Sequence, residues 1–369
     1  MSNLKICNRC VLNENYPGVK ISDSQKCSCC TDMFGDTYKN YRAAFKNYQE
    51  FKKGIKNFTG KHYALLMLSG GKDSTYLLNE LVNKYGINVL GFSVKHPFES
   101  EVALNNINSL IQKIPFEHIH LSLNTKVYKK IMQKVFSLKR DDIFSERLPC
   151  TVCGYITEIA GVTMAYMHKI PYVVYANDPL QILNTDYNIK KDLENMIKIC
   201  GKADVYSLFG KDIIDEIIRA EEDELPTIVT PYVAMMDSYN ENEIIEKLKA
   251  ENLYRGDSVQ TYCSLVPLLN YYSFSKYNSY FFGHQLAQEV RQGNTDRDFA
   301  LSYMEMYRKI IMEIAIKEDI TEDDMKFIRT VLEKKYGKDN KEKIEYECKS
   351  IVNMRNVANA LQLNISTNS

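Results

Sequence analysis

A six-residue turn, Ser69–Ser74, contains the residue types that bind phosphate groups in proteins. Its two glycines allow a tight turn that brings backbone N–H groups close to phosphate oxygens. Lys72 adds a positive charge, and a helix expected after the turn directs its positive dipole end at the same place. The turn is not a Walker A loop, because that pattern requires glycine in place of Leu66 and a hydroxyl residue in place of Asp73. We therefore predict a phosphate-binding loop of another type, formed by Ser69, Gly70, Gly71, Lys72, Asp73, Ser74 and Thr75.

Five of the ten cysteines lie within the first thirty residues. Cys7 and Cys10 form one CxxC pair, and Cys27 and Cys30 form a second. A segment this short buries too little apolar surface to order itself, and four thiolates around one zinc ion replace the missing core. We predict a structural zinc ribbon rather than a loose tail of unrelated thiols, because four protein ligands leave no open position on the ion. Cys29 is surplus, and the sequence leaves open whether Cys29 or Cys30 is the fourth ligand.

A further CxxC pair, Cys150 and Cys153, lies between Pro149 and Gly154. In an intracellular chain such thiols more often act as ligands or catalysts than as disulfides. The pair is compatible with a persulfide site, in which one thiol is the donor and the other resolves it. A purely structural pair and a second zinc site remain alternatives. Cys200 and Cys348 stand alone and suit buried packing roles.

The elements that position these residues follow from hydrophobic periodicity, which alternates short apolar runs with amphipathic stretches. The expected strands are Tyr63–Leu68, Ile87–Val94, His118–Leu123 and Ile170–Ala176, and the expected helices between and around them are Thr75–Tyr85, Ser100–Lys113, Val127–Lys139 and Tyr155–His168. Strands separated by helices of this length indicate βαβ units and a doubly wound parallel sheet, hence an α/β fold. Loops that follow parallel strands meet at one edge of the sheet, so Asn177 and Asp178 are expected on the same edge as the Ser69–Ser74 turn.

The remaining chain is mainly helical. The expected helices are Lys211–Glu222, Asn240–Asn252, Ser264–Lys276, Phe299–Glu318, Glu322–Tyr336 and Lys341–Leu361. We divide the chain into a zinc ribbon (1–32), a helical connector (33–60), a nucleotide-binding core (61–180), the remainder of the core with a substrate region (181–298) and a helical C-terminal region (299–369). The charged C-terminal helices are expected to form a solvated outer layer or a homodimer surface. His284, Glu289 and Arg291 either face a substrate or belong to a capped surface helix.

Composition narrows the partners. The 369 residues include 47 Lys and Arg against 47 Asp and Glu, so the formal net charge is zero. Proteins that bind long nucleic acids usually carry a basic excess, so a small-molecule or nucleotide-linked substrate is favoured, while tRNA is not excluded. The chain contains no stretch of 18 uninterrupted apolar residues and no apolar core of a signal peptide, so we expect a cytoplasmic protein without a membrane span.

The SGGKDS sequence after the first expected strand resembles the signature of the PP-loop ATP pyrophosphatases, the adenine nucleotide alpha-hydrolase-like superfamily, over roughly residues 60–180. This resemblance implies that the loop binds ATP, which adenylates a substrate oxygen and releases pyrophosphate before a nucleophile displaces AMP. It implies that Phe92, Ser93 and Val94 hold the adenine by backbone contacts. Mg²⁺ is the expected companion of the phosphates, placed by Asp73 or Asp178.

The second CxxC pair resembles one branch of this superfamily, the iron–sulfur-dependent tRNA thiolation enzymes. The resemblance implies that Cys150, Cys153 and a distant cysteine, here Cys263, hold a [4Fe-4S] cluster beside the ATP site. Three thiolates leave one iron free for an exogenous sulfide from a sulfur donor. The leading hypothesis is therefore ATP-dependent replacement of a carbonyl or amide oxygen by sulfur.

The N-terminus resembles a different branch, the N-acetyl sugar amidotransferases, through its two CxxC pairs and the Pro17-Gly18-Val19 run between them. Those enzymes convert a sugar acetamido group into an acetamidino group with ammonia derived from glutamine. No glutaminase triad is evident in the chain, so this alternative requires a separate glutaminase subunit.

Overall fold

The computed structural model describes residues 4–16, 18–31, 37–99, 101–138, 148–184, 187–236, 238–254 and 263–365. The chain forms two compact units, each assembled from separate stretches of sequence. The unit that we call the helical unit comprises Met1–Met33, Met132–Thr151 and Cys263–Ser369. The other, which we call the sheet unit, comprises Phe34–Ile131 and Val152–Tyr262.

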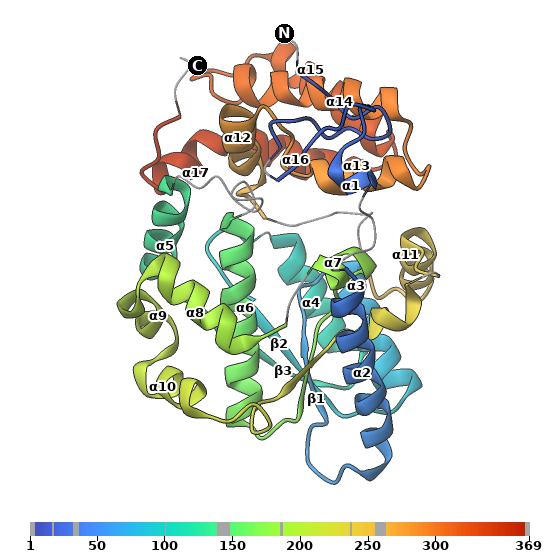
Figure 1. Ribbon diagram of the computed structural model, residues 1–369, viewed down its shortest axis with the longest axis vertical. Coiled ribbons are helices and arrows are strands. Elements are labelled where there is room, and N and C mark those ends of the chain that lie inside the picture. The colour runs from blue at the N-terminus through green and yellow to red at the C-terminus, as the bar shows by residue number, and fades with distance from the viewer. Residues whose placement is uncertain are drawn as a thin grey trace. The chain divides into compact units, whose positions relative to one another are not determined.

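The sheet unit is built on five parallel strands in the order β3-β2-β1-β4-β5, of which β1, β2 and β3 are labelled in Figure 1. The strands are β1 (Ala64–Met67), β2 (Val89–Lys95), β3 (Glu117–Ser122), β4 (Tyr172–Val174) and β5 (Thr227–Val229). The chain runs outward from β1 to β2 and β3, then returns to the other side of β1 for β4 and β5. This reversal makes the carboxyl ends of β1 and β4 a topological switch point, where open α/β sheets bind their ligands. The doubly wound α/β sheet expected from the sequence is confirmed.

Helices cover both faces of this sheet. The elements of the sheet unit, besides its strands, are α2 (Thr37–Gly54), η1 (Ile55–Asn57), α3 (Lys72–Asn79), the π-turn η2 (Glu80–Lys84), α4 (Glu101–Lys113), α7 (Pro179–Asn184), α8 (Ile189–Cys200), α9 (Lys202–Phe209), α10 (Lys211–Arg219), η3 (Pro231–Met235) and α11 (Glu241–Ala250). Alternate residues of β1 point to opposite faces. Leu66 packs in a buried cluster with residues of α2, α3, α4 and α11, while Met67 on the other face packs against Gly161 of helix α6 (Leu148–Met167).

Two helices, α5 (Thr125–Ser137) and α6 (Leu148–Met167), contribute residues to both units. Within the described residues, α6 alone is long and apolar enough to cross a membrane, and 61% of that stretch is buried in the structure. The core helix of a soluble protein has the same properties, so α6 is weak evidence for a membrane span.

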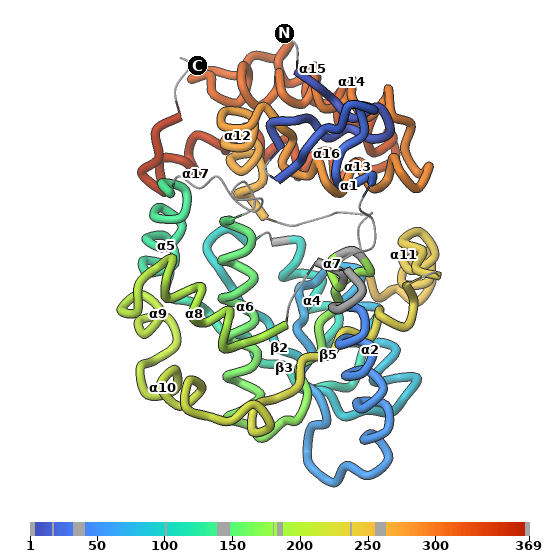
Figure 2. The backbone as a smooth tube through the Cα atoms, in the orientation of Figure 1, coloured from blue at the N-terminus to red at the C-terminus, as the bar shows by residue number. Residues whose placement is uncertain are grey.

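The helical unit joins the N-terminal segment to the C-terminal helices. Its elements besides the ends of α5 and α6 are α1 (Ser28–Thr31), α12 (Val266–Tyr277), α13 (Gly283–Arg291), α14 (Arg297–Lys309), the π-turn η4 (Ile310–Ile314), α15 (Glu322–Tyr336), α16 (Lys341–Val352) and α17 (Met354–Ala360). In Figure 2 the blue N-terminal tube lies beside the orange helices of this unit. Tyr16 fixes the contact, because its hydroxyl donates to the carbonyls of Tyr280 at 3.0 Å and Phe281 at 3.1 Å.

Several expected elements differ from those observed. The helix after the phosphate loop begins at Lys72 rather than Thr75, so the loop residues themselves form its first turn. The expected helix Lys341–Leu361 is broken at Asn353 into α16 and α17. Hydrophobic periodicity does not predict β5, which has only three residues, or α7 to α9, which follow β4. The ends of two expected helices, Ser100 and Lys139, lie outside the described residues.

Candidate active site and metal centre

The phosphate loop occupies the carboxyl end of β1, beside the switch point. Gly70 adopts a φ of +72°, and a Cβ atom there would lie 2.3 Å from the backbone oxygen of Ala103. The loop therefore requires glycine at this position both for its backbone conformation and for its close approach to α4. Asn106 of α4 donates to the carbonyl of Gly70 at 2.9 Å, which holds the turn against that helix.

Hydroxyl groups brace the interior of the turn. The Ser69 and Ser74 hydroxyls lie 3.2 Å apart, and the Ser74 hydroxyl also donates to the carbonyl of Gly71 at 3.2 Å. Gly71 is the N-cap of α3 and, as a glycine, has no side chain that could cap the helix, while the Ser69 hydroxyl accepts the N–H of Gly71 at 3.4 Å. Thr75 is fully buried, and its hydroxyl has no hydrogen-bond partner among the described residues. An uncapped helix start beside a glycine turn suits an anion, which the free N–H groups and the helix dipole attract.

Lys72 lies between acidic side chains at the start of α3. Its ammonium is 2.6 Å from Asp73 and 3.5 Å from Glu241, the first residue of α11. Burial alone would lower the pKa of Lys72, but the nearby carboxylates of Asp73, Glu241 and Asp178 outweigh it, so the pKa is raised. The lysine is therefore a fixed cation at neutral pH.

Asp73 is held by two tyrosines from the segment after β5. The Tyr239 hydroxyl donates to Oδ1 of Asp73 at 2.8 Å, and the Tyr232 hydroxyl donates to its backbone carbonyl at 3.1 Å. Burial and the neighbouring carboxylates raise the pKa of both phenols, so both remain hydrogen-bond donors. The sequence analysis identified Asp73 but not the two tyrosines that position it.

The expected adenine contacts lie on β2. The side chains of Phe92 and Ser93 are buried, and the Ser93 hydroxyl donates to the carbonyl of Leu68 at 2.7 Å. Val94 lies beyond the last β1–β2 pair, Met67–Phe92, while β2 continues to pair with β3. The carbonyl of Phe92 accepts the N–H of Leu68, which directly follows β1, so the backbone groups of Phe92 point toward β1. Backbone groups two residues apart in a strand point to the same side, so the N–H and C=O of Val94 also point to the β1 side. Such a backbone position can form hydrogen bonds with a base edge, as the family resemblance implies.

Asp178 follows β4 on the same edge of the sheet. Its Oδ1 accepts the N–H of Gln181 at 2.9 Å, which starts α7. The negative charge of Asp178 is one of the causes of the raised pKa of Lys72, so the two side chains interact electrostatically. Asn177 instead donates to the Tyr187 hydroxyl at 2.5 Å.

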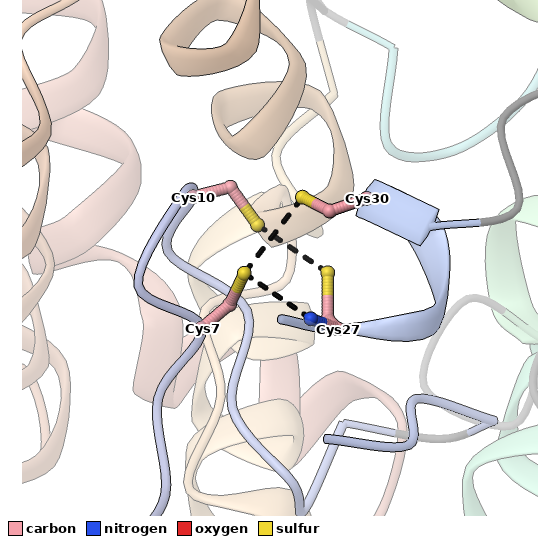
Figure 3. A group of neighbouring side chains, drawn as sticks. All are labelled: Cys7, Cys10, Cys27 and Cys30. Atoms are coloured by element: carbon pink, nitrogen blue, oxygen red, sulfur yellow. Dashed lines mark hydrogen bonds between the residues drawn. The ribbon is translucent and has the colours of Figure 1, made fainter. Parts of the chain in front are cut away.

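The first four paired cysteines form a metal-sized cluster in the helical unit (Figure 3). The sulfurs of Cys7, Cys10, Cys27 and Cys30 all lie within 4.8 Å of one another, with 3.7 Å between Cys7 and Cys30 and 3.6 Å between Cys10 and Cys27. Four sulfurs bound tetrahedrally to one zinc ion at its usual bond length would lie about 3.8 Å apart. The residues therefore fit a single tetrahedral metal ion, and Cys30 rather than Cys29 completes the group.

Backbone groups support these thiols. Burial raises the pKa of Cys7, but the N–H groups of Cys27 and Arg9, at 3.3 Å and 3.4 Å from its sulfur, more than offset this and lower the pKa to about 6. Arg297 of α14 donates to the carbonyls of Cys7 at 2.7 Å and Cys10 at 3.0 Å. The first CxxC pair is thereby fixed to the C-terminal helices.

The second cysteine set is divided between the two units. Cys150 is exposed and, like Cys263, belongs to the helical unit, whereas Cys153 belongs to the sheet unit. Burial raises the pKa of Cys153, and a hydrogen bond from the Tyr128 hydroxyl, at 3.4 Å from its sulfur, opposes this effect. Cys150 and Cys153 lie three residues apart in α6, hence on one side of that helix.

Other candidates occupy structural positions. His284 packs edge-on against Tyr16, with ring centroids 4.7 Å apart, and Glu289 accepts a hydrogen bond from Thr295 at 3.2 Å. His118 bonds to the Ser93 hydroxyl at 2.9 Å, and burial lowers its pKa to about 4. These side chains join neighbouring elements within their own units.

No family model matches the chain, and no curated protein matches it. Among solved structures, the U34-tRNA thiolase NcsA from Methanococcus maripaludis with its [4Fe-4S] cluster is similar at 14% identity and a TM-score of 0.35, over 84% of this chain and 89% of that one. NMN synthetase from Francisella tularensis is similar at 13% identity and a TM-score of 0.30, over 70% of this chain and 97% of that one. Likenesses at this level do not assign the chain to a family.

Proposed function

We propose that the chain is an ATP-dependent adenylating enzyme of the PP-loop type, which forms AMP and pyrophosphate. The observation that carries this proposal is the Ser69–Ser74 turn, with Gly70 in the left-handed region, between β1 and an uncapped helix at the switch point of a parallel sheet. The loop N–H groups and Lys72 would bind the phosphates, and Asp73 and Asp178 would place Mg²⁺. The substrate oxygen would attack the α-phosphorus, pyrophosphate would leave, and an incoming nucleophile would then displace AMP.

Within this proposal, the incoming atom is sulfur. Cys150, Cys153 and Cys263 would hold a [4Fe-4S] cluster, which supplies an iron able to bind sulfide; alternatively, one thiol of the CxxC pair would carry a persulfide received from a sulfane-sulfur donor, and the other thiol would resolve it by forming a disulfide. The support is the CxxC spacing, which places Cys150 and Cys153 on one side of α6. A sulfur donor would then be a required partner.

The alternative is nitrogen transfer to an N-acetyl sugar, with ammonia from a separate glutaminase subunit. The four-cysteine cluster favours it, because the N-terminal cysteine pattern is the part that resembles the sugar amidotransferases. We propose zinc as the ion in that cluster in either case, since four thiolates in a closed tetrahedral group suit a structural zinc.

The loop assignment is tested by titration calorimetry with ATP and Mg²⁺. Lys72→Ala is expected to weaken ATP binding by at least tenfold, because a buried cation that contacts phosphate is lost. Lys53→Ala, which removes an exposed lysine of α2 in the same unit, is the matched control and is expected to bind as the wild type does. Equal ATP affinity in the wild type and in Lys72→Ala would refute the assignment.

The acceptor and the incoming atom need separate experiments. Incubation with ATP and, in turn, nucleotide-linked N-acetyl sugars, a small-molecule extract and total tRNA, with detection of AMP, identifies the acceptor class. Iron and sulfide analysis after anaerobic purification distinguishes sulfur from nitrogen transfer. Iron that is lost on Cys153→Ser and retained on Cys200→Ala supports the sulfur proposal, whereas absence of iron together with full activity of Cys153→Ser removes it.

A further inference from the structure

The segment after β5 returns to the first turn of α3 and contacts both charged residues there. Tyr239 and Tyr232 hold Asp73, and Glu241 lies 3.5 Å from the ammonium of Lys72. Sequence motifs do not identify Glu241, which lies far along the chain in the first turn of α11. Its carboxylate reaches the one lysine of the phosphate loop.

Packing remote from the loop fixes the position of this glutamate. Lys247 of α11 forms an ion pair with the buried Glu80 at 2.8 Å, and Asn79 donates to Glu251 at 2.6 Å. These contacts join α11 to α3 and η2 along their length. Glu241 is consequently presented to the loop by a helix that is anchored elsewhere, rather than by a loose side chain.

The N-terminus of α11 is capped by a residue other than Glu241. Asn240 is the N-cap of α11, and its side chain accepts the N–H groups of Asn242 and Glu243. Glu243 in turn accepts a hydrogen bond from the Asn240 amide at 2.9 Å. Any acidic residue in the first turn favours the helix dipole, but the cap itself does not need Glu241 to point at Lys72.

Two carboxylates beside a single ammonium give this part of the loop a negative net charge. Lys72 contributes one positive charge, whereas Asp73 and Glu241 each contribute a negative one. A phosphate that binds Lys72 therefore competes with Glu241 for the same cation. Metal-free ATP carries about four negative charges at neutral pH, and bound Mg²⁺ offsets two of them. The carboxylate of Glu241 therefore repels metal-free ATP more strongly than it repels the magnesium complex.

We infer that Glu241 is a specificity-determining residue of the nucleotide site, which makes the loop favour the magnesium complex of a nucleoside triphosphate over the metal-free triphosphate. The inference rests on the proposed function, because it requires ATP to bind at the Ser69–Ser74 turn. Tyr239 complements Glu241 by keeping Asp73 in place, so the loop retains one fixed carboxylate for the metal.

The test measures the dissociation constant of ATP with excess Mg²⁺ and with EDTA, and takes the ratio of the two as the metal preference. Glu241→Gln removes the charge while keeping the shape. Glu246→Gln makes the same charge change on the exposed face of α11 and is the matched control. Glu241→Asp keeps the charge on a shorter side chain, and thermal unfolding of all variants shows whether α11 remains packed.

We expect the metal preference of Glu241→Gln to fall about fivefold relative to the wild type, which is the scale of a partly exposed charge pair, with tighter binding of metal-free ATP as the cause. Glu246→Gln and Glu241→Asp are expected to stay close to the wild type. An unchanged metal preference in a folded Glu241→Gln variant, with normal ATP binding by the wild type, overturns this inference alone. Failure of the wild type to bind ATP under either condition overturns the proposed function as well.

Discussion

Alanine at Gly70 perturbs the phosphate loop without changing its charge. The new Cβ atom would lie 2.3 Å from the backbone oxygen of Ala103, and the φ of +72° disfavours any side chain. Gly86, two residues after the end of η2, provides a matched comparison in the same unit. Its φ is +63°, but a Cβ atom there would meet nothing within 4 Å. Both substitutions place an alanine in the left-handed conformation, and only Gly70→Ala adds a steric clash, with the backbone of Ala103.

The magnitudes follow from these two terms. The left-handed conformation costs an alanine about 1 kcal/mol, which is the expected loss of unfolding free energy for Gly86→Ala. A carbon and an oxygen in van der Waals contact lie about 3.2 Å apart, so Gly70→Ala also requires a shift of about 0.9 Å between the loop and the backbone of α4. Overpacking of this kind costs about 2 kcal/mol, giving about 3 kcal/mol in total.

Urea unfolding followed by circular dichroism measures the stability difference, and calorimetry measures ATP binding. Gly70→Ala is expected to unfold at lower urea than Gly86→Ala and to lose ATP binding, because the loop N–H groups shift by a large fraction of a hydrogen-bond length. Gly86→Ala is expected to retain wild-type affinity. If the two variants unfold at the same urea concentration and bind ATP equally, the packing of the loop against α4 is wrong.

Three further predictions concern the metal cluster and a buried carboxyl group. Replacing Cys7 and Cys10 together by serine should remove one equivalent of zinc, measured by mass spectrometry of the metal content. Arg297→Ala should speed zinc loss to a chelator about tenfold, because supporting residues around a metal commonly contribute that much, whereas Arg329→Ala should not. Glu99→Gln should raise the unfolding free energy by about 2 kcal/mol at pH 8 and by little at pH 4, because burial raises the pKa of the half-buried Glu99 to about 7 and solvent screening reduces the full linkage value.

The sign of the last prediction follows from proton linkage. A carboxyl group with a raised pKa in the folded protein is protonated there while the unfolded chain is already ionised. Stability therefore falls as the pH rises from the ordinary pKa of glutamate to about 7, and the penalty persists above that. A Glu99→Gln variant with the same pH profile as the wild type contradicts the burial argument. For the cluster, undiminished zinc in the double cysteine variant contradicts the ribbon.

Local sequence signals sufficed for the features that depend on neighbouring residues. The Ser69–Ser74 turn was recognisable because its glycines, lysine and hydroxyls act together over six positions, and β1 to β4 were recognisable as apolar runs between helices. The parallel direction of the strands then followed from the lengths of the connections between them, whereas the order of the strands was not predicted. The same local character explains why the paired cysteines predicted a metal group.

Contacts between segments that are distant in sequence could not be predicted from local sequence patterns. Tyr239 lies 166 residues from Asp73 in sequence, and β5, which carries the chain back to the loop, has only three residues. A strand that short has no periodicity to detect. The choice between Cys29 and Cys30 likewise depends on which side of the α1 turn faces the other thiols, because adjacent helical residues point about 100° apart.

The proposed function requires that the Ser69–Ser74 turn binds the phosphates of ATP. A crystal structure of the protein with Mg²⁺ and an ATP analogue that cannot be cleaved between the α- and β-phosphates tests it most directly. We expect phosphate oxygens within hydrogen-bond distance of the N–H groups of the turn and of the ammonium of Lys72, with the base beside Val94. A nucleotide bound elsewhere, with Lys72 still paired to Glu241, would contradict it.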